Sequence, residues 1–248
     1  MDDTISQFKT LIEENSKIVF FTGAGISTES GIPDFRSPGG LWEQNRPIDF
    51  SEFMASEEAR RESWRRKFAM EPVLSKARPN DGHRAIAELY AEGKVSAVVT
   101  QNIDGLHQIS GVSEDDVVEI HGNTTYAKCL DCEERMSLDV VRATFAENER
   151  LPICTVCGGM IKTATISFGQ AMPIEKMQRA EQEAIECDLL IVVGSSLVVY
   201  PAAEIPVIAR HHGADLVILN REATQLDSYA TLTVNREIGE TLKCVTKV

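Results

Sequence analysis

The sequence predicts an α/β fold in which a doubly wound parallel sheet carries a smaller inserted domain. Three observations lead to this prediction. Short apolar segments rich in Val and Ile alternate with helical patterns along most of the chain. This alternation breaks twice, first at a charge-rich helical stretch and then at two Cys-x2-Cys pairs. Strands that alternate with helices form parallel sheets, so the two interruptions supply the smaller domain.

The expected strands are continuous apolar runs, because a parallel strand covered by helices is buried on both faces. They span residues 17–22, 95–101, 117–121, 189–194 and 216–220. Helical patterns lie between them, at residues 4–15, 83–92, 175–186 and 202–211. In a sheet of this kind, ligands bind at the carboxyl ends of the strands. The polar residues that follow the strands therefore form the candidate site.

The two interruptions also set the expected domain boundaries. We expect the large domain to comprise residues 1–35, 81–124 and 163–248, and the small domain to comprise residues 36–80 and 125–162. Residues 36–80 would supply a helical part, and residues 125–162 a part that contains the cysteine pairs. A cleft between two such domains is a common place for a ligand.

Composition narrows the possible function classes. The 248 residues are 43% hydrophobic, enough for a sizeable core, and carry a formal net charge of −13. An acidic chain lacks the clustered Lys and Arg that neutralise phosphates, so we expect no nucleic-acid partner. No apolar stretch approaches the length of a transmembrane helix, and the acidic, amphipathic first residues are unlike a signal peptide. We therefore expect a cytoplasmic protein that binds no membrane, whereas the oligomeric state stays open.

Four cysteines have the spacing of a zinc site. They are Cys129, Cys132, Cys154 and Cys157. Two Cys-x2-Cys pairs separated by 21 residues can surround one tetrahedral ion, and four thiolates leave no open position for catalysis. Such a metal stabilises the fold, so any catalytic group must lie elsewhere in the chain. The alternative is disulfides, which cytoplasmic proteins rarely contain.

The first expected strand runs into a glycine-rich turn that contains Gly23, Ala24, Gly25 and Ser27. Glycines let backbone amides approach a pyrophosphate at the start of a helix, so this turn is a candidate dinucleotide site. The fingerprint is incomplete because Thr28 stands where its third glycine is expected, and an ordinary glycine turn is the alternative. The loop that follows contains Asp34, Phe35 and Arg36. It brings an aromatic ring and charges beside the same turn.

Polar side chains also follow the second and third expected strands. The second strand leads into Gln101, Asn102, Ile103 and Asp104, and the third ends at His121. Amides and a carboxylate at this edge could hydrogen-bond a ribose or a carboxamide; alternatively, Asn102 or Asp104 caps the next helix. Histidine is the usual general base because its pKa lies near neutrality, although a single histidine at a strand end is often structural.

Small and polar residues follow the fourth and fifth expected strands. They are Gly194, Ser195 and Ser196 after the fourth, and Asn220 and Arg221 after the fifth. These groups suit the phosphate and ribose of a second nucleotide. Ordinary strand-to-helix loops are the alternative.

Together these segments resemble the sirtuin family over nearly the whole chain. The motifs that carry the resemblance follow the family order: the 23–27 turn, Gly31-Ile32-Pro33-Asp34-Phe35-Arg36, Gln101-Asn102-Ile103-Asp104, His121-Gly122-Asn123, the cysteine quartet and Gly194-Ser195-Ser196. The resemblance implies a Rossmann-like large domain and a zinc-ribbon part in the small domain. It also implies an NAD-dependent protein lysine deacetylase, with NAD as a consumed co-substrate and one structural Zn²⁺.

The resemblance further implies roles for the site residues. His121 would be the general base that activates a ribose hydroxyl, Asn102 would orient the ribose, and Asp104 would hold the nicotinamide carboxamide. The products would be free lysine, nicotinamide and O-acetyl-ADP-ribose. The implied NAD-binding residues are Gly23, Ala24, Gly25, Ser27, Asp34, Phe35, Arg36, Gln101, Asn102, Ile103, Asp104, Gly194, Ser195, Ser196, Asn220 and Arg221.

An acetyl-lysine protein or peptide is the implied partner, and it would contact Ile166, Phe168 and Gly169. In the family this segment usually reads close to R-P-x-V-V-x-F-G-E, whereas here Thr163 replaces the proline and Gln170 replaces the acid. These departures affect the contacts expected with the peptide. The chain lacks the Tyr-x-x-Arg pair of members that prefer succinyl or malonyl groups, so we expect a neutral acyl group, acetyl.

Two other functions fit the same residues. One is mono-ADP-ribosyl transfer, which would use the same NAD site to modify a protein. The other is a zinc-ribbon interaction protein that senses NAD without turnover. His121, Asn102 and Asp104 count against this last function, because a protein that only binds NAD does not need all three.

Overall fold

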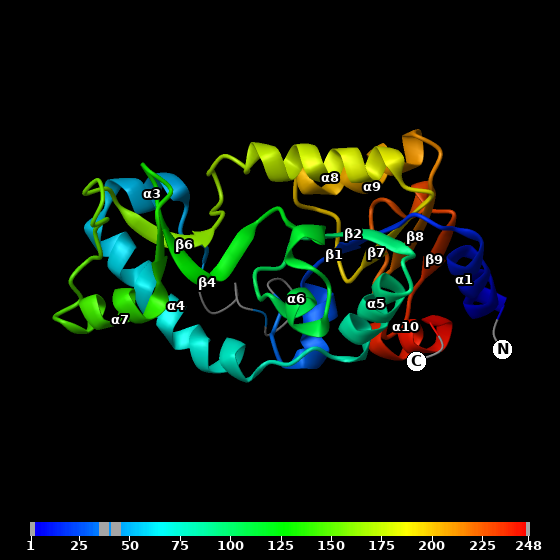
Figure 1. The fold of residues 1–248 in the computed structure, drawn as a ribbon, viewed down its shortest axis with the longest axis horizontal. Coiled ribbons are helices and arrows are strands. Elements are labelled where there is room, and N and C mark those ends of the chain that lie inside the picture. The colour runs from blue at the N-terminus through cyan, green and yellow to red at the C-terminus, as the bar shows by residue number, and fades with distance from the viewer. Residues whose placement is uncertain (1–2, 35–39, 41–45, 247–248) are drawn as a thin grey trace.

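The structure is a computed structural model that describes residues 3–34, 40 and 46–246. These residues form two sheets, one of six strands and one of three. The sheets lie toward opposite ends of the long axis of the molecule, each with helices of its own (Figure 1). None of the helices within the described residues combines the length and the apolar character needed to cross a bilayer.

The larger sheet is parallel throughout, with the strand order β3-β2-β1-β7-β8-β9. Its strands are β1 (Ile18–Thr22), β2 (Val95–Thr100), β3 (Val117–Glu119), β7 (Leu189–Val193), β8 (Asp215–Leu219) and β9 (Leu232–Val234). The five predicted strands are confirmed, whereas β9 was not predicted because it is a three-residue edge strand that pairs only with β8. The order reverses between β1 and β7, which creates the crevice where doubly wound sheets bind ligands.

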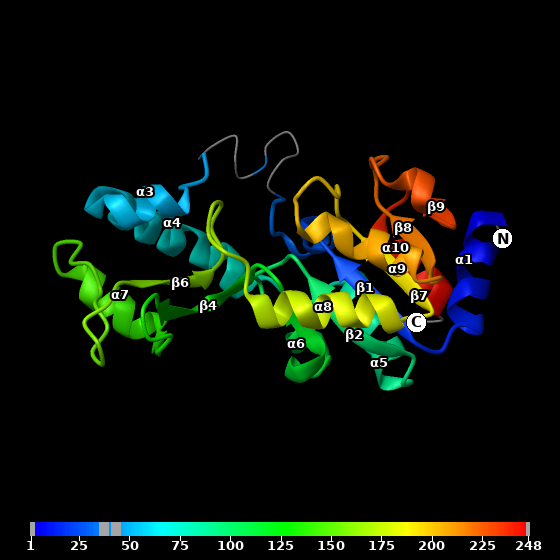
Figure 2. The ribbon, with the colours of Figure 1, turned by 90° about the horizontal axis from the view of Figure 1, so that it is seen from above.

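Helices cover both faces of this sheet (Figures 1 and 2). One face packs against α1 (Asp3–Glu14), α5 (Asp81–Ala91) and α10 (Ile238–Thr246), and the other against α8 (Ile174–Glu186) and α9 (Ile205–His211). Strand β1 illustrates the alternation: Ile18 and Phe20 join the first core, and Val19 and Phe21 join the second. Both faces of each central strand are therefore apolar, which explains the continuous apolar runs in the sequence.

The smaller sheet is antiparallel, with the order β5-β4-β6. Its strands are β4 (Gly122–Cys129), β5 (Arg135–Ser137) and β6 (Ile161–Thr165), and the helices beside it are α3 (Phe50–Ala55), α4 (Glu57–Lys76) and α7 (Leu138–Ala146). Trp64 of α4, Phe145 of α7 and Ile161 of β6 share a core that is separate from the cores of the large sheet. The predicted fold class is thus confirmed. The residue boundaries of the domains stay a prediction, since β4 and β6 run across two of them.

The loops after β1 and β7 touch through their backbones at the point where the strand order reverses. The main-chain nitrogen of Gly25 donates to the oxygen of Gly194 at 2.8 Å. A Cβ atom on Gly25 would lie 2.7 Å from the Cα of Gly194, and one on Gly194 would overlap the nitrogen of Ile26. Gly194 also has a φ of +64°. Glycine at these two positions therefore allows the two halves of the sheet to meet.

This close approach predicts a stability difference between two Gly→Ala variants. Gly194→Ala should lower the free energy of unfolding by about 2 kcal/mol, because its new methyl group has no room. Gly93 has a similar φ of +77° and no atom within 4 Å of its would-be Cβ, so Gly93→Ala is the matched control and should cost about 1 kcal/mol. Urea denaturation of both variants measures the difference. Equal losses would contradict the crowding at Gly194.

Candidate active site

A cavity of about 700 Å³ opens where the carboxyl ends of β1, β2, β7 and β8 face the end of β6. Most of the site residues predicted from the sequence line it. They are Gly23, Ala24, Gly25, Asp34, Gln101, Asn102, Ile103, His121, Ile166, Phe168, Gly169, Gly194, Ser195, Ser196, Asn220 and Arg221. Ser27 and Asp104 lie behind the wall, and Phe35 and Arg36 fall outside the described residues.

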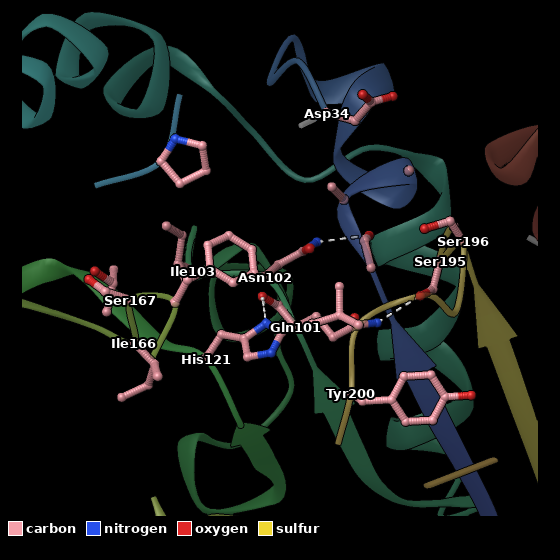
Figure 3. A pocket seen from close by; sticks show the side chains of 18 of the residues that line it. Asp34, Gln101, Asn102, Ile103, His121, Ile166, Ser167, Ser195, Ser196 and Tyr200 are labelled. Carbon is pink, nitrogen blue, oxygen red and sulfur yellow. Dashed lines mark hydrogen bonds between the residues drawn. The ribbon is translucent and has the colours of Figure 1, made fainter. Parts of the chain in front are cut away.

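His121 lies at the junction of the two sheets, between the end of β3 and the start of β4. Its Nδ1 atom is 3.1 Å from the main-chain oxygen of Gln101. A carbonyl oxygen can only accept, so Nδ1 carries the hydrogen, and the lone pair of a neutral ring is then on Nε2. Figure 3 shows the ring between Gln101 and Ile166, both of which line the cavity. The fold therefore fixes both the tautomer and the position of this imidazole.

Asn102 is held by a chain of hydrogen bonds behind the cavity wall. Its Nδ2 atom donates to the main-chain oxygen of Gly23 and to Ser27 Oγ, both at 3.1 Å, and Ser27 Oγ donates to Asp104 Oδ2 at 2.7 Å. The other carboxylate oxygen of Asp104 accepts at 2.9 Å from the nitrogen of Leu106, the first residue of α6 (Leu106–Ser110), whose N-cap is Gly105. Burial raises the pKa of Asp104, and these two hydrogen bonds oppose that shift. The chain joins the loop after β1 to the loop after β2.

Gln101 and Ser195 tie the end of β2 to the loop after β7. Gln101 Nε2 donates to Ser195 Oγ at 2.8 Å, a contact visible in Figure 3. Ser195 Oγ also accepts from the nitrogen of Leu197 at 3.3 Å. On the far side of the cavity, the Arg221 guanidinium pairs with Glu237 at 2.7 Å, which raises the pKa of Arg221. Gln101 and Ser195 on one side, and Arg221 on the other, therefore have partners that hold them at the cavity.

Residues 165–170 form the cavity wall opposite these loops. Ile166 and Ser167 lie on the side of His121 that faces away from Ser195 and Ser196 (Figure 3). The nitrogen of Ile166 donates to the main-chain oxygen of His121 at 2.9 Å, so the backbone itself joins this wall to the histidine. We call residues 165–170 the β6 wall.

The cavity also contains residues that the sequence motifs do not assign to the site, although Thr28 and Gln170 are departures within two of those motifs. They are Thr28, Pro47, Ile48, Thr165, Ser167, Gln170, Met172, Val199, Tyr200, Pro201, Glu222 and Ile238. Many of them are single apolar residues outside any motif, so no local pattern marks them. Ile238, for example, reaches the cavity from the start of α10, close to the other end of the chain from Gly23. Only the tertiary fold reveals such neighbours.

The four paired cysteines come together at the edge of the small sheet. Their sulfur atoms lie within 4.8 Å of one another, with individual Sγ–Sγ distances of 3.4, 3.5 and 3.6 Å. A tetrahedral ion with Zn–S bonds of about 2.3 Å needs sulfurs about 3.8 Å apart, so the cluster fits zinc. The distances are far too long for disulfide bonds, and all six cysteines are free thiols. The cluster does not belong to the cavity wall, which agrees with a bracing role.

Comparison with known proteins gives the same family from sequence and from structure. The sequence model of the Sir2 family matches residues 23–201. A Rhodopseudomonas palustris protein named NAD-dependent protein deacetylase is 58% identical over 238 residues, which are 96% of this chain and 94% of that protein. NAD-dependent protein deacetylase 1 of Bradyrhizobium diazoefficiens is also 58% identical, over 96% of this chain and 93% of its own length.

Solved structures of Sir2 proteins superimpose on nearly all of the chain. A Sir2 variant with a deacetylated p53 peptide and 3′-O-acetyl ADP ribose gives a TM-score of 0.88 at 36% identity and covers 98% of each chain. Sir2 with a p53 peptide and NAD⁺ gives a TM-score of 0.86 at 37% identity and covers 100% of this chain and 98% of the other. The chain therefore belongs to the Sir2 family, the sirtuins.

Proposed function

We propose that this protein is an NAD-dependent protein lysine deacetylase, which transfers the acetyl group of acetyl-lysine to ADP-ribose and releases nicotinamide. One observation carries the proposal: a single cavity brings His121 together with the glycine loops of the large sheet and with the β6 wall. The names of the relatives and the NAD and peptide in the related structures support it.

NAD would occupy the part of the cavity next to the large sheet. The backbone of Gly23, Ala24 and Gly25, which lines the cavity after β1, would lie under its pyrophosphate. Ser195 and Arg221, near the carboxyl ends of β7 and β8, would face the adenosine half. Hydrogen bonds hold Ser195 to Gln101 and Gly25 to Gly194, so this part of the site is preorganised.

His121 would act as the general base. Its Nδ1–H donates to the oxygen of Gln101, so Nε2 is the atom that would accept a proton from a ribose hydroxyl. Asn102, fixed by Gly23 and Ser27, would orient that ribose. Asp104 would act from behind the wall, by holding the loop that presents Ile103 to the nicotinamide.

Acetyl-lysine would enter along the β6 wall. The wall contributes the apolar residues Ile166 and Phe168, and Ile103, Ile48 and Met172 also line the cavity. Among the described residues that line the cavity, Arg221 is the one Arg or Lys, and it lies at the end of β8 rather than at this wall. Because none of the described residues of this wall presents an Arg or Lys side chain to the cavity, the wall favours a neutral acyl group over succinyl or malonyl.

Zinc bound by Cys129, Cys132, Cys154 and Cys157 would brace the small sheet. Cys129 ends β4, the strand that begins beside His121, so the zinc site would stabilise the strand that leads from the histidine. We further propose a cytoplasmic location, which the lack of disulfide bonds among the six cysteines supports, and no nucleic-acid or membrane partner.

The reaction can be tested directly with NAD and an acetyl-lysine peptide. We expect equal amounts of nicotinamide, deacetylated peptide and O-acetyl-ADP-ribose, measured by mass spectrometry. Nicotinamide release with ADP-ribose attached to protein and no deacetylation would favour mono-ADP-ribosyl transfer instead. No nicotinamide release at all would rule out an enzyme of either kind.

Replacing His121 tests the general base. His121→Ala should lower kcat for deacetylation by about two orders of magnitude or more, because proton transfer to a positioned base contributes that much. NAD affinity, measured by calorimetry, should stay within about threefold of wild type, since other residues hold the pyrophosphate. His211, exposed at the end of α9, is the matched control, and His211→Ala should behave as wild type. Full activity of His121→Ala would disprove this role.

Removal of zinc tests the cysteine cluster. Cys154→Ala should lose the metal, the cooperative melting of the small sheet and the deacetylase activity together, because a structural zinc contributes folding free energy. Cys244 is an exposed cysteine outside the cluster, so Cys244→Ala should keep one zinc per chain and full activity. Metal content by atomic emission and thermal unfolding are the measurements. An active, metal-free Cys154→Ala protein would contradict the assignment.

A further inference from the structure

Lys162 on β6 carries an ammonium group that is almost completely removed from solvent. The residue is only 3% exposed. Its Nζ atom donates to the main-chain oxygen of Thr165 at 2.5 Å and to that of Thr163 at 3.4 Å, and it lies 6.0 Å from the ring centre of Phe53. None of the ion pairs formed among the described residues includes it.

Such an ammonium group is costly to keep inside a protein. Burial lowers the pKa of Lys162 to about 8, which reflects the absence of a compensating carboxylate. An apolar side chain of similar length would fill the same space without that cost. The shorter of its two hydrogen bonds goes to the main-chain oxygen of Thr165. We therefore expect the lysine to fix the position of Thr165.

Thr165 is the point at which β6 becomes the β6 wall. It is the last residue of β6, it pairs with Gly122, and it begins the run of residues that line the cavity. The following residue, Ile166, is bonded through its nitrogen to the oxygen of His121. A shift of Thr165 would therefore move the wall relative to the histidine.

Helix α3 holds the same wall at a second point. The nitrogen of Phe50, the first residue of α3, donates to the main-chain oxygen of Phe168 at 2.8 Å. Phe53, from the same helix, is the ring that faces the Lys162 ammonium. Lys162 thus holds the start of the wall directly and contacts the helix that holds its middle.

We propose that Lys162 is a positioning residue that holds the β6 wall in place for the acyl-lysine substrate. This inference rests on the proposed function. Lys162 makes no hydrogen bond to the loops of the large sheet that would hold NAD, so its effect falls on peptide binding and not on NAD binding. Lys162 does not line the cavity and acts through its hydrogen bond to the main-chain oxygen of Thr165.

The experiment compares Lys162→Met, which removes the charge, with Lys162→Arg, which keeps a cation. For Lys162→Met we expect KM and Kd for an acetyl-lysine peptide to rise about tenfold, the effect of losing a charged hydrogen bond. The kcat and the KM for NAD should stay within about twofold of wild type, a split that general destabilisation would not produce. Lys162→Arg should restore peptide affinity to within about threefold, because a guanidinium can also donate to the Thr165 oxygen.

Lys128 provides a matched control. It pairs directly with Lys162 across β4 and β6, but its side chain is 37% exposed and forms an ion pair with Glu133. Lys128→Met should leave both Michaelis constants unchanged. One zinc per chain and cooperative melting establish that each variant is folded. If Lys162→Met fails these criteria, the uncharged variant Lys162→Gln takes its place.

Several outcomes would overturn the proposal. A folded, uncharged variant at position 162 with wild-type peptide affinity would do so. Equal losses in peptide affinity, NAD affinity and kcat would do so as well, and so would an Arg variant as impaired as the Met variant. The peptide Kd is measured by fluorescence anisotropy without turnover. A wild-type protein that binds acetyl-lysine peptide but does not deacetylate it would refute the proposed function and leave this comparison valid.

Discussion

The backbone crossing at Gly122 is the constraint on which the rest of the site depends. Gly122 has a φ of +75°, and any Cβ there would overlap the main-chain oxygen of Ala164. Without a side chain, β4 can begin directly against β6, and the nitrogen of Ile166 reaches the oxygen of His121. The contact of Gly122 with β6 thus joins His121, at the end of the large sheet, to the β6 wall through main-chain atoms alone.

A second crossing, at the point where the strand order reverses, completes the cavity. There Gly25 and Gly194 bring the loops after β1 and β7 into backbone contact, and Gln101 and Ser195 bridge the adjacent ends of β2 and β7. Both main-chain contacts depend on glycines, because a Cβ atom at Gly122, Gly25 or Gly194 would overlap backbone atoms. The buried Lys162 adds a polar contact of the same kind at the end of β6.

The part of the site that follows the strands of the large sheet could be predicted from sequence motifs. Glycine turns, the Gln101–Asp104 segment and His121 directly follow apolar strands, and the rule that strand ends share one edge brought them together. The strand order and β9 could not be predicted, because pairing depends on contacts between distant segments. The role of Lys162 was equally hidden, since a lysine in a strand usually indicates a solvated face. Its burial places the ammonium beside Phe53 of α3, a neighbour distant in sequence that only the folded chain reveals.

The ¹⁵N NMR spectrum of the histidine side chains tests the central claim most directly, namely that the fold presents Nε2 of His121 as the base. The hydrogen bond from Nδ1 to the oxygen of Gln101 requires the hydrogen on Nδ1 when the ring is neutral. A spectrum assigned by comparison with His121→Ala should therefore give a protonated Nδ1 and an unprotonated Nε2 for this ring in its neutral form. A neutral His121 with its hydrogen on Nε2 would contradict the account.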